Sequence, residues 1–256
     1  MNYGLQISSS GLLTSLYRQD ALTNNLANLN TVGFKPISPA VRQREPASIE
    51  DGLGHLPSSA LLEQLGAGVL LGPNRVSFKP GPLLEGGELD LAIDGDGFFA
   101  VPGADGQSPR LTRDGRLTLD ARGTLVQAAS GLPVLNVAGR PIALPPQTPV
   151  EIDADGRIFD REGSQLDQIR LVGVRDTGAL RPEGQGLFVA PPGALEAGWP
   201  AGGRIVQRFV EGSSVEPIDA LQDITSASGA VSANAAMIDF QDRLMDRAIN
   251  ALGRVS

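Results

Sequence analysis

Hydrophobic residues at the two ends of the chain follow helical spacing. Residues 4–30 carry leucines separated by 7, 4, 6, 4 and 3 positions, which places them in one narrow stripe along a helix. Residues 218–255 follow a stricter pattern, because a large apolar residue recurs every seven positions and a second set stands three positions further on. The leucine stripe comprises Leu5, Leu12, Leu16, Leu22, Leu26 and Leu29. The seven-residue repeat comprises Ile224, Val231, Ile238, Met245 and Leu252, with Ala227, Asn234, Gln241, Ala248 and Val255 at the second position.

Each of these stripes is too narrow to anchor its helix on a sheet and suits another helix instead. The large residues make one good seam position of a coiled coil. The second position is mixed, because Ala227, Asn234 and Gln241 are too small or too polar for a stable dry core. We therefore expect the terminal helices to pair with each other or with the same helices of neighbouring copies.

The stretch between the two ends changes to the period of β-strands. In "GELDLAIDGDGFFAV", residues 87–101, apolar and polar positions alternate before a turn at Asp94 to Gly97, which predicts a hairpin. Asp114-Gly115 predicts a second tight turn, and "DARG" at 120–123 predicts a third. Turn signals continue every eight to twelve residues, so this part of the chain is expected to form an antiparallel β domain.

The predicted fold class is mixed α and β, with terminal helices in a coiled-coil-like core element and a central antiparallel all-β domain. Between the first helix and the strands, Pro, Gly and Ser alternate with short apolar pieces, which predicts an extended linker or loop. The expected divisions are an N-terminal helix and motif at 1–35, the linker at 36–72, the β domain at 73–212 and the C-terminal heptad helix at 213–256.

The end of the first helix is unusually rich in asparagine. "TNNLANLNTVGFKP", residues 23–36, contains four asparagines, although Asn favours caps and turns over helix interiors. We expect Gly33 to take the left-handed conformation that ends a helix, and Pro36 to prevent the helix from resuming. The amides of Asn24, Asn25 and Asn28 can donate and accept hydrogen bonds toward neighbouring backbone or other subunits.

Composition excludes several classes of protein. Acidic residues outnumber basic ones by 29 to 21 and the arginines are scattered, so nucleic acid is not an expected partner. The absence of cysteine rules out disulfides and thiolate metal sites. No apolar run approaches the length needed to span a bilayer, and the first residues lack the basic and apolar regions of a secretory signal peptide. We expect a soluble or assembled protein that is not inserted in a membrane.

Candidate chemistry is sparse. The single histidine, His55, lies in a Gly/Pro loop without a local nucleophile or orienting partner, which favours an exposed loop residue over a general base. Acidic residues cluster in 90–96 and at Asp153 and Asp155, but these clusters lack the spacing of an EF-hand and stand at Asp-Gly turns. No metal or cofactor motif is present, and we expect no enzyme activity. A periplasmic β-rich protein that binds or cleaves glycans stays the alternative from another class, because two carboxylates need only meet in space.

Residues 10–35 join the leucine helix to the sequence N-N-x-A-N-x-x-T-x-G-F-K. Three further blocks follow in order, "LDLAIDGDGFFAV" at 89–101, "LTRDGRLTLDARGTLV" at 111–126 and "FVEGSSVEPIDAL" at 209–221. Together these blocks resemble the axial proteins of the bacterial flagellum, in particular the rod proteins of the basal body. The positions that match the first motif are Asn24, Asn25, Ala27, Asn28, Thr31, Gly33, Phe34 and Lys35.

The resemblance implies a structural subunit without catalysis or cofactor. Its terminal helices would pack into the coiled-coil core of a helical tube, with the β domain outside. Copies of the chain and other rod or hook proteins would be its partners. It would leave the cytoplasm through the flagellar type III export apparatus without a cleaved signal peptide, and polymerise in the periplasm into the driveshaft from motor to hook. The expected assembly residues are Leu12, Leu16, Leu22, Asn24, Asn25, Leu26, Asn28, Thr31, Gly33, Phe34, Ile224, Val231, Ile238, Met245 and Leu252.

Two features separate this chain from the pattern of that family. Its members commonly carry an Arg-aromatic-Glu cluster in the C-terminal helix, where this chain has "ITSASGAVSANAAMIDFQD". The second feature concerns which component of the rod the chain resembles. The length, "PIDALQDI" and "IRLVGVRDTGALRPEGQGLF" favour the proximal rod protein, with a distal rod or hook-type axial protein as the alternative.

Overall fold

The computed structural model describes residues 3–45, 49, 68–103, 108–145, 149–191, 193–194 and 202–252, so His55 lies outside the described residues. The chain divides into two units. The helical unit comprises Met1–Leu26, Ile37–Arg75 and Glu216–Ser256, and the β unit comprises Ala27–Pro36 and Val76–Val215.

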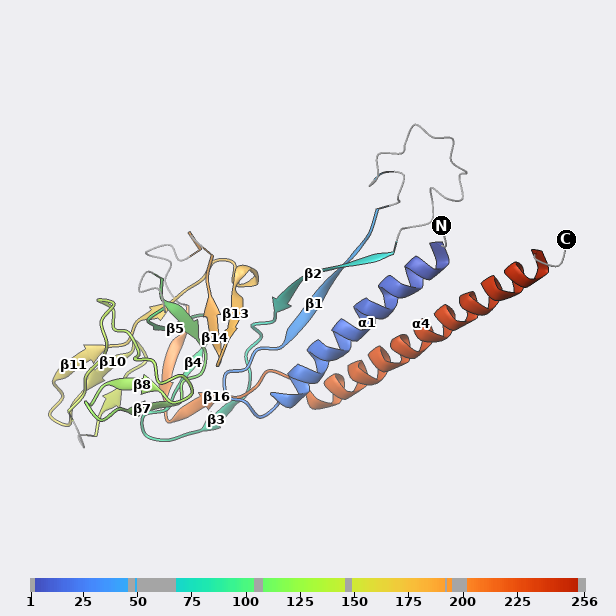
Figure 1. Ribbon diagram of the computed structural model, residues 1–256. Helices are drawn as coiled ribbons and strands as arrows, with labels where there is room; N and C mark the ends of the chain where they lie inside the picture. The colour runs from blue at the N-terminus through green and yellow to red at the C-terminus, as the bar shows by residue number, and fades with distance from the viewer. Residues whose placement is uncertain are drawn as a thin grey trace. The chain divides into compact units, whose positions relative to one another are not determined.

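Two long helices form most of the helical unit. The helix α1 (Tyr3–Ala27) and the helix α4 (Pro217–Leu252) run side by side in opposite directions (Figure 1). Pro217 begins α4, where the N–H that proline lacks would have no helical partner, and Asp219 in the first turn complements the helix dipole. Neither described helix is long and apolar enough to cross a membrane.

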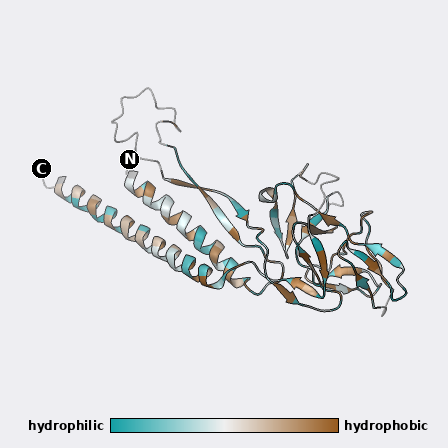
Figure 2. Cartoon of the chain, turned by 180° about the vertical axis from the view of Figure 1, so that it is seen from behind, coloured by the Kyte–Doolittle hydropathy of each residue, from teal (hydrophilic) through white to brown (hydrophobic). Residues whose placement is uncertain are grey.

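The burial pattern of α4 follows the seven-residue repeat. Ala227 is buried, and the other described repeat positions through Met245 are partly buried, whereas most of the remaining helix is exposed. Both helices mix hydrophobic and hydrophilic residues along their whole length (Figure 2). The sequence therefore identified the inward face of α4 as far as Met245, whereas Ala248 is exposed and the side chain of Leu252 is not described.

The segment assigned to a linker contains regular structure at both of its ends. The strands β1 (Ile37–Gln43) and β2 (Val69–Val76) pair in a two-stranded sheet. The proline-rich composition concealed β1, because period-two alternation is broken by Pro39 and by exposed residues on both faces.

The β unit is built from short antiparallel strands, as the turn spacing predicted. Its largest sheet has the order β12-β5-β6-β14-β13, a second has the order β11-β10-β9, and three pairs join β15 to β4, β16 to β3 and β7 to β8. A short 3-10 helix, η1 (Thr177–Ala179), precedes β13. The strand bounds are β3 (Leu83–Glu85), β4 (Leu91–Asp94), β5 (Phe98–Val101), β6 (Arg110–Thr112), β7 (Leu117–Leu119), β8 (Leu125–Gln127), β9 (Glu151–Ile152), β10 (Arg157–Phe159), β11 (Gln165–Gln168), β12 (Leu171–Val172), β13 (Arg181–Gly184), β14 (Leu187–Val189), β15 (Arg204–Gln207) and β16 (Phe209–Glu211).

An aliphatic core holds these sheets together. Its members come from β4, β5, β7 to β10 and β15, and from the loops between them, and Phe99 is its only aromatic member among the described residues. The core cluster comprises Leu91, Ile93, Phe99, Leu117, Leu125, Val134, Ile142, Leu144, Val150, Ile152, Ile158, Ile169 and Ile205. Burial of this apolar surface is the main driving force for folding of the unit.

The predicted hairpin across Asp94 to Gly97 is wrong. The strand before this turn, β4, pairs with β15 from the far end of the unit, whereas β5 pairs with β6 and β12. All of Leu91, Ala92 and Ile93 are buried, so both faces of β4 are covered and simple alternation does not describe it. Arg204 lies opposite Asp94 in this pairing.

The predicted tight turn at Asp114-Gly115 is also wrong, because β6 and β7 belong to different sheets. Gly115 is needed for a close approach instead, since a Cβ there would collide with the carbonyl oxygen of Leu91. That backbone contact includes a 2.9 Å hydrogen bond from the N–H of Leu91 to the carbonyl of Gly115.

The "DARG" turn is confirmed as the link between β7 and β8. Gly123 has a φ of 80°, and the Asp120 carboxylate accepts hydrogen bonds of 2.8 Å from the N–H groups of Arg122 and Thr124. The bond from Thr124 is the main reason that the pKa of Asp120 lies below its usual value.

Replacement of Gly115 by alanine tests the close approach to Leu91. We expect Gly115→Ala to lower the free energy of unfolding by about 3 kcal/mol, because the backbone must move to relieve the collision. Urea unfolding followed by circular dichroism measures the change. Gly87→Ala is the matched control, since a Cβ there meets Asp90 only at an ordinary 3.5 Å. Equal stability of the two variants would contradict this role for Gly115.

Candidate assembly interface

Small and polar residues line the contact between α1 and α4. Ideal Cβ atoms built on Gly4 and Gly11 would lie 2.6 Å from Nε2 of Gln241 and 2.8 Å from Oδ1 of Asn234, respectively. The Nε2 of Gln241 also donates to Oγ of Ser8 at 3.5 Å. The two polar positions of the repeat therefore lie at the contact between the helices, where glycines on α1 make room for them.

Further along the same contact, Nε2 of Gln19 donates to Oγ of Ser228 at 3.1 Å, and Arg18 pairs with Asp223 at 3.9 Å. Both members of the ion pair are about half exposed, so it contributes little stability. Oε1 of Gln241 is buried without a hydrogen-bond partner. An interface with this composition holds the helices in register with a modest gain in free energy.

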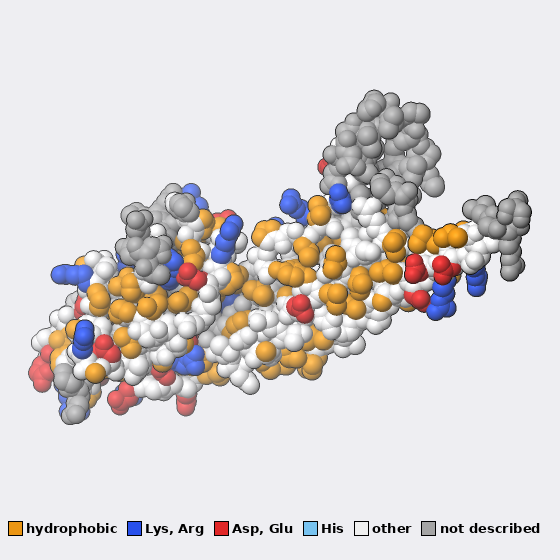
Figure 3. Space-filling model, in the orientation of Figure 1, with side chains coloured by type: hydrophobic (Ala, Val, Ile, Leu, Met, Phe, Trp, Pro, Cys, Tyr) orange, Lys and Arg blue, Asp and Glu red, His pale blue; other side chains and the backbone are white. Residues whose placement is uncertain are grey.

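The outward surfaces of both helices carry large apolar side chains. On α1, Leu13 is 64% exposed, and Leu16 and Tyr17 are each 40% exposed. On α4, Met237, Phe240 and Leu244 are 50%, 57% and 47% exposed. Spacings of three and four residues place each set on one side of its helix. We call these sets the outer stripes, and Figure 3 shows hydrophobic side chains spread along the visible surface of the helical unit.

The predicted assembly residues of α1 are distributed over more than one face. Leu12, Leu22 and Leu26 are partly buried, and only Leu16 of the predicted leucines belongs to an outer stripe. Leu13 and Tyr17 were not among the residues selected from the sequence. Leu13 and Tyr17 are four positions apart, so they lie on the same side of a helix. This spacing is the sequence signal that could have identified them.

Asn25 joins α1 to β1 within the helical unit. Its Nδ2 donates to the carbonyl of Ile37 at 2.8 Å, and its Oδ1 accepts from the N–H of the same residue at 2.9 Å. Asn25 is only 5% exposed, and both the nitrogen and the oxygen of its side-chain amide make hydrogen bonds. Asn25 therefore bonds neighbouring backbone, whereas Asn24 is exposed and Asn28 accepts from the hydroxyl of Thr31 at 3.1 Å.

The rest of the motif belongs to the β unit. The helix ends at Ala27, three residues earlier than predicted. Gly33 has a φ of 68°, which confirms the left-handed conformation, but it lies six residues beyond the helix and does not cap it. The N–H of Gly33 donates to the carbonyl of Glu211 at 2.6 Å, and a Cβ on Gly33 would lie 2.6 Å from the backbone nitrogen of Asp114. Glycine is required here for both its conformation and its size.

Lys35 follows two residues later and is buried in an ionic cluster. Its ammonium group donates to Oε1 of Glu211 and to the carbonyl of Lys79, both at 2.7 Å. Oε2 of Glu211 accepts from the Arg113 guanidinium at 3.3 Å. The exposed fractions of the three side chains are 0% for Lys35, 1% for Glu211 and 5% for Arg113. We call this set the buried clasp.

The clasp contains two cations and one carboxylate. Burial lowers the pKa of Lys35 below its usual value, and the nearby Glu211 opposes that shift. Burial likewise lowers the pKa of Arg113, again opposed by Glu211. Removing charges from water costs several kcal/mol per ion, and the hydrogen bonds to Glu211 offset part of that cost.

The clasp joins three segments that are distant in the sequence. The N–H of Ser77 donates to Pro36 at 2.9 Å, the N–H of Ser214 donates to Phe34 at 3.3 Å, and the N–H of Gly81 donates to Oε1 of Glu211 at 3.0 Å. These segments are the ones by which the chain enters or leaves the β unit. Neither Arg113 nor Glu211 was selected from the sequence, although a glutamate inside the apolar run "FVEG" is an unusual position that needs a buried partner.

The acidic clusters serve turns in this structure. Oδ1 of Asp153 accepts from the N–H groups of Asp155 and Arg157 at 3.0 and 2.8 Å, and Oδ2 of Asp90 accepts from Gly87 at 2.7 Å. Within the described part of the chain, no three potential ligands from His, Cys, Asp or Glu gather to hold a metal ion.

Known proteins resemble this chain over its whole length. Residues 5–35 match the family described as flagella basal body rod protein, and residues 92–167 match the D1 domain of the flagellar hook protein FlgE/F/G. The chain is 32% identical over 265 residues to the flagellar basal-body rod protein FlgF of Caulobacter vibrioides, with 100% of both chains covered. It is 30% identical to the flagellar basal-body rod protein FlgG of Bacillus subtilis, over 94% of this chain and 96% of the relative.

Substitution of Gly33 tests its double requirement. We expect Gly33→Ala to cost at least about 2 kcal/mol more than Gly131→Ala in the free energy of unfolding. The control is matched in conformation, because Gly131 has a φ of 69°, but nothing lies within 4 Å of a Cβ there. Urea denaturation of both variants gives the difference. Equal losses would show that the left-handed conformation alone accounts for Gly33.

Loss of the Lys35 charge tests the buried clasp. We expect Lys35→Met to lower the free energy of unfolding by about 3 kcal/mol, because Glu211 loses one of its two cations inside the protein. Denaturant unfolding of the β unit measures this loss. Arg243→Met removes an exposed partner of Asp239 and is the control, expected to change stability by less than about 0.5 kcal/mol. A Lys35→Met protein as stable as this control would refute the role of the clasp.

Proposed function

Since the chain belongs to the flagellar basal-body rod protein family and is a structural subunit of the rod, we propose that it polymerises through the outer stripes of its terminal helices. Copies of the chain and other axial proteins of the flagellum are the partners. The location is the flagellar basal body. Contacts between unlike surfaces that do not close into a ring generate a helical filament, which is the geometry a rod requires.

The exposure of Phe240 between Met237 and Leu244 is the observation that carries this proposal. Three large apolar residues lie on one side of α4, all about half exposed. Contiguous apolar surface of this kind marks sites of protein association. The outer stripe of α1 supplies a second surface of the same chemistry, so one subunit offers two faces to its neighbours.

The internal contact between α1 and α4 supports the same proposal. Small and polar residues interrupt this contact, whereas several large apolar residues of both helices stay exposed. We infer that helices of neighbouring subunits complete a larger coiled-coil-like core around this pair. Delivery through the flagellar type III export apparatus is part of the proposal and follows from the resemblance of residues 10–35 to the axial proteins.

The choice between proximal and distal rod component stays a prediction. Relatives named FlgF and FlgG match this chain at 32% and 30% identity, both over nearly the whole length. Identity therefore does not separate them, and the preference for the proximal component depends on the chain length and on the stretches at 217–224 and 169–188.

A charge placed in the outer stripe of α4 tests polymerisation. We expect Phe240→Asp to abolish rod assembly and motility in cells that lack the natural protein, because an ion cannot be buried in an apolar contact without a partner. Since Phe240 is exposed in the single chain, the free energy of unfolding should change by less than about 0.5 kcal/mol. Motility in soft agar and electron microscopy of basal bodies measure assembly.

The matched control is Ala235→Asp, which adds the same charge to an exposed position on another side of α4. This variant should assemble normally. Rods of normal number and length in cells with Phe240→Asp would contradict the proposal, whereas equal loss in both variants would show a general effect of charge on the helix.

A further inference from the structure

The contacts between α1 and α4 give the register of the helix pair. The two helices run in opposite directions, with Gly4 against Gln241 and Gly11 against Asn234. The two residue numbers add up to the same value at both places. Each residue of one helix can therefore be matched with the position that lies beside it on the other helix.

This register places the outer stripes of one chain at different heights along the pair. Phe240, in the stripe of α4, lies level with Leu5 of α1. Tyr17, in the stripe of α1, lies about twelve residues further along that helix, which is a distance of about 18 Å. The two stripes of one chain are thus staggered along the helix axis by this distance.

The two stripes match each other in their spacing. Leu13 and Tyr17 are four positions apart on α1, as are Phe240 and Leu244 on α4. When two helices pack in opposite directions with Tyr17 against Phe240, Leu13 falls against Leu244. All four residues are at least 40% exposed, so both halves of such a contact lie on the surface of every copy.

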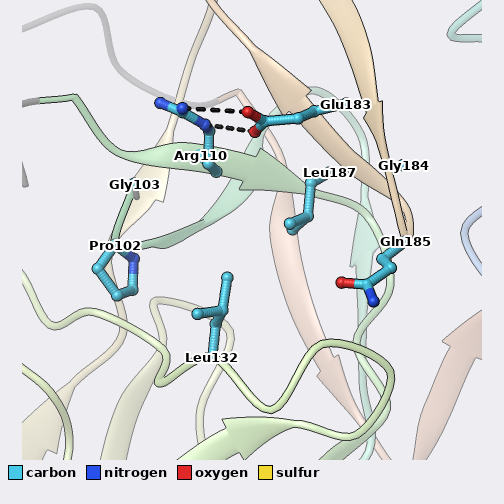
Figure 4. A pocket seen from close by; sticks show the side chains of 8 residues that line it. All are labelled: Pro102, Gly103, Arg110, Leu132, Glu183, Gly184, Gln185 and Leu187. Carbon is cyan, nitrogen blue, oxygen red and sulfur yellow. Dashed lines mark hydrogen bonds and ion pairs between the residues drawn. The ribbon is translucent and has the colours of Figure 1, made fainter. Parts of the chain in front are cut away.

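Apolar residues also line a cavity of the β unit, but they are less accessible. The cavity has a volume of about 310 Å³, and Leu187 in its wall is 8% exposed, with Pro102 and Leu132 partly buried. Figure 4 shows the charged residues at this cavity, Arg110 and Glu183, paired with each other through bonds of 2.5 and 3.2 Å. Side chains recessed in this way leave little surface for a second copy, so the outer stripes suit such a contact better.

We propose that the outer stripe of α1 packs against the outer stripe of α4 on a second copy of this chain, which has the same orientation and is displaced by about 18 Å along the helix axis. This rests on the function proposed above, in which the outer stripes mediate polymerisation, and adds which stripe meets which. We assign the same orientation because α1 and α4 already pack in opposite directions within the chain, and copies that point the same way repeat that packing. Each copy offers one stripe to each of two neighbours, so the contact does not close and generates a filament.

The area of the outer stripes favours a repeated contact over an isolated pair. The six side chains together expose roughly 600 Å², whereas a stable pair of proteins usually buries about 1,200 Å² or more. One such contact is therefore too small to hold two copies together in dilute solution. In an array every copy makes the contact twice, and the gain in free energy accumulates with the number of copies.

Disulfide crosslinking tests this register, because the natural chain contains no cysteine that could react. A chain with both Leu13→Cys and Leu244→Cys is produced in cells that lack the natural protein, and the cells are oxidised with diamide. We expect an antibody against the chain to detect a ladder of crosslinked oligomers on non-reducing gels. A disulfide within one chain is excluded, because the two positions differ by about 18 Å in height and a disulfide needs Cα atoms within about 7 Å.

The matched control combines Leu13→Cys with Ala233→Cys. Ala233 is exposed and lies on the same side of α4 as Phe240, but within one chain it stands at nearly the same height as Leu13. This control should give no ladder, because only copies at equal height bring the two positions together. The variant Tyr17→Cys/Phe240→Cys belongs to the same register as Leu13 with Leu244 and should give a ladder as a second, independent measurement.

The outcomes separate this register from the proposed function. A ladder in the Ala233 control would show neighbours at equal height, and preferential crosslinking of Leu13→Cys to Phe240→Cys would show a reversed copy; either result overturns the proposal. Loss of the ladder in both predicted variants, while Phe240→Asp still prevents assembly, overturns this register and leaves the proposed function intact. Normal assembly of Phe240→Asp contradicts the proposed function itself.

Discussion

The carboxylate of Glu211 is the group on which the ends of the β unit depend. It accepts from Lys35 two residues after the left-handed glycine, from Arg113 after β6, and from the backbone of Gly81. The backbone carbonyl of Glu211 also accepts a hydrogen bond from the N–H of Gly33. Charge-assisted bonds of this kind are strong when buried, and a buried charge that lacks its partner is costly. The segments that these bonds join are therefore expected to become ordered together.

The helical unit follows a different principle. Glycine, serine, asparagine and glutamine stand among the partly buried apolar residues of the contact between α1 and α4, whereas other large apolar side chains, such as Leu13 and Phe240, are exposed. A self-contained domain would bury most of these large apolar side chains and expose the polar ones. The arrangement suits a rod subunit, because the apolar surface left exposed can contribute favourable free energy when it is buried between molecules.

Local features of this protein were predictable from sequence, and distant pairings were not. The inward face of α4 and the conformation of Gly33 depend on periodicity and on one residue type, and both predictions were confirmed. The hairpins at Asp94 to Gly97 and Asp114-Gly115 were wrong because β4 chooses β15, more than a hundred residues later. Turn residues indicate that the chain bends, but they do not indicate which strand pairs with β4. That pairing depends on the burial of both faces of β4. Arg113 and Glu211 were missed for the same reason, since their meeting depends on the completed fold.

The bond between Lys35 and Glu211 spans 176 positions of a chain of 256 residues. Contacts between such distant positions form late, because the entropy of closing a long loop must be overcome before they give any stability. When the chain emerges from its N-terminus first, Lys35 cannot form this bond until Glu211 has emerged, more than two thirds of the chain length later. A truncated chain, however well its first helix forms, therefore lacks the carboxylate that Lys35 and Arg113 bind in the complete protein.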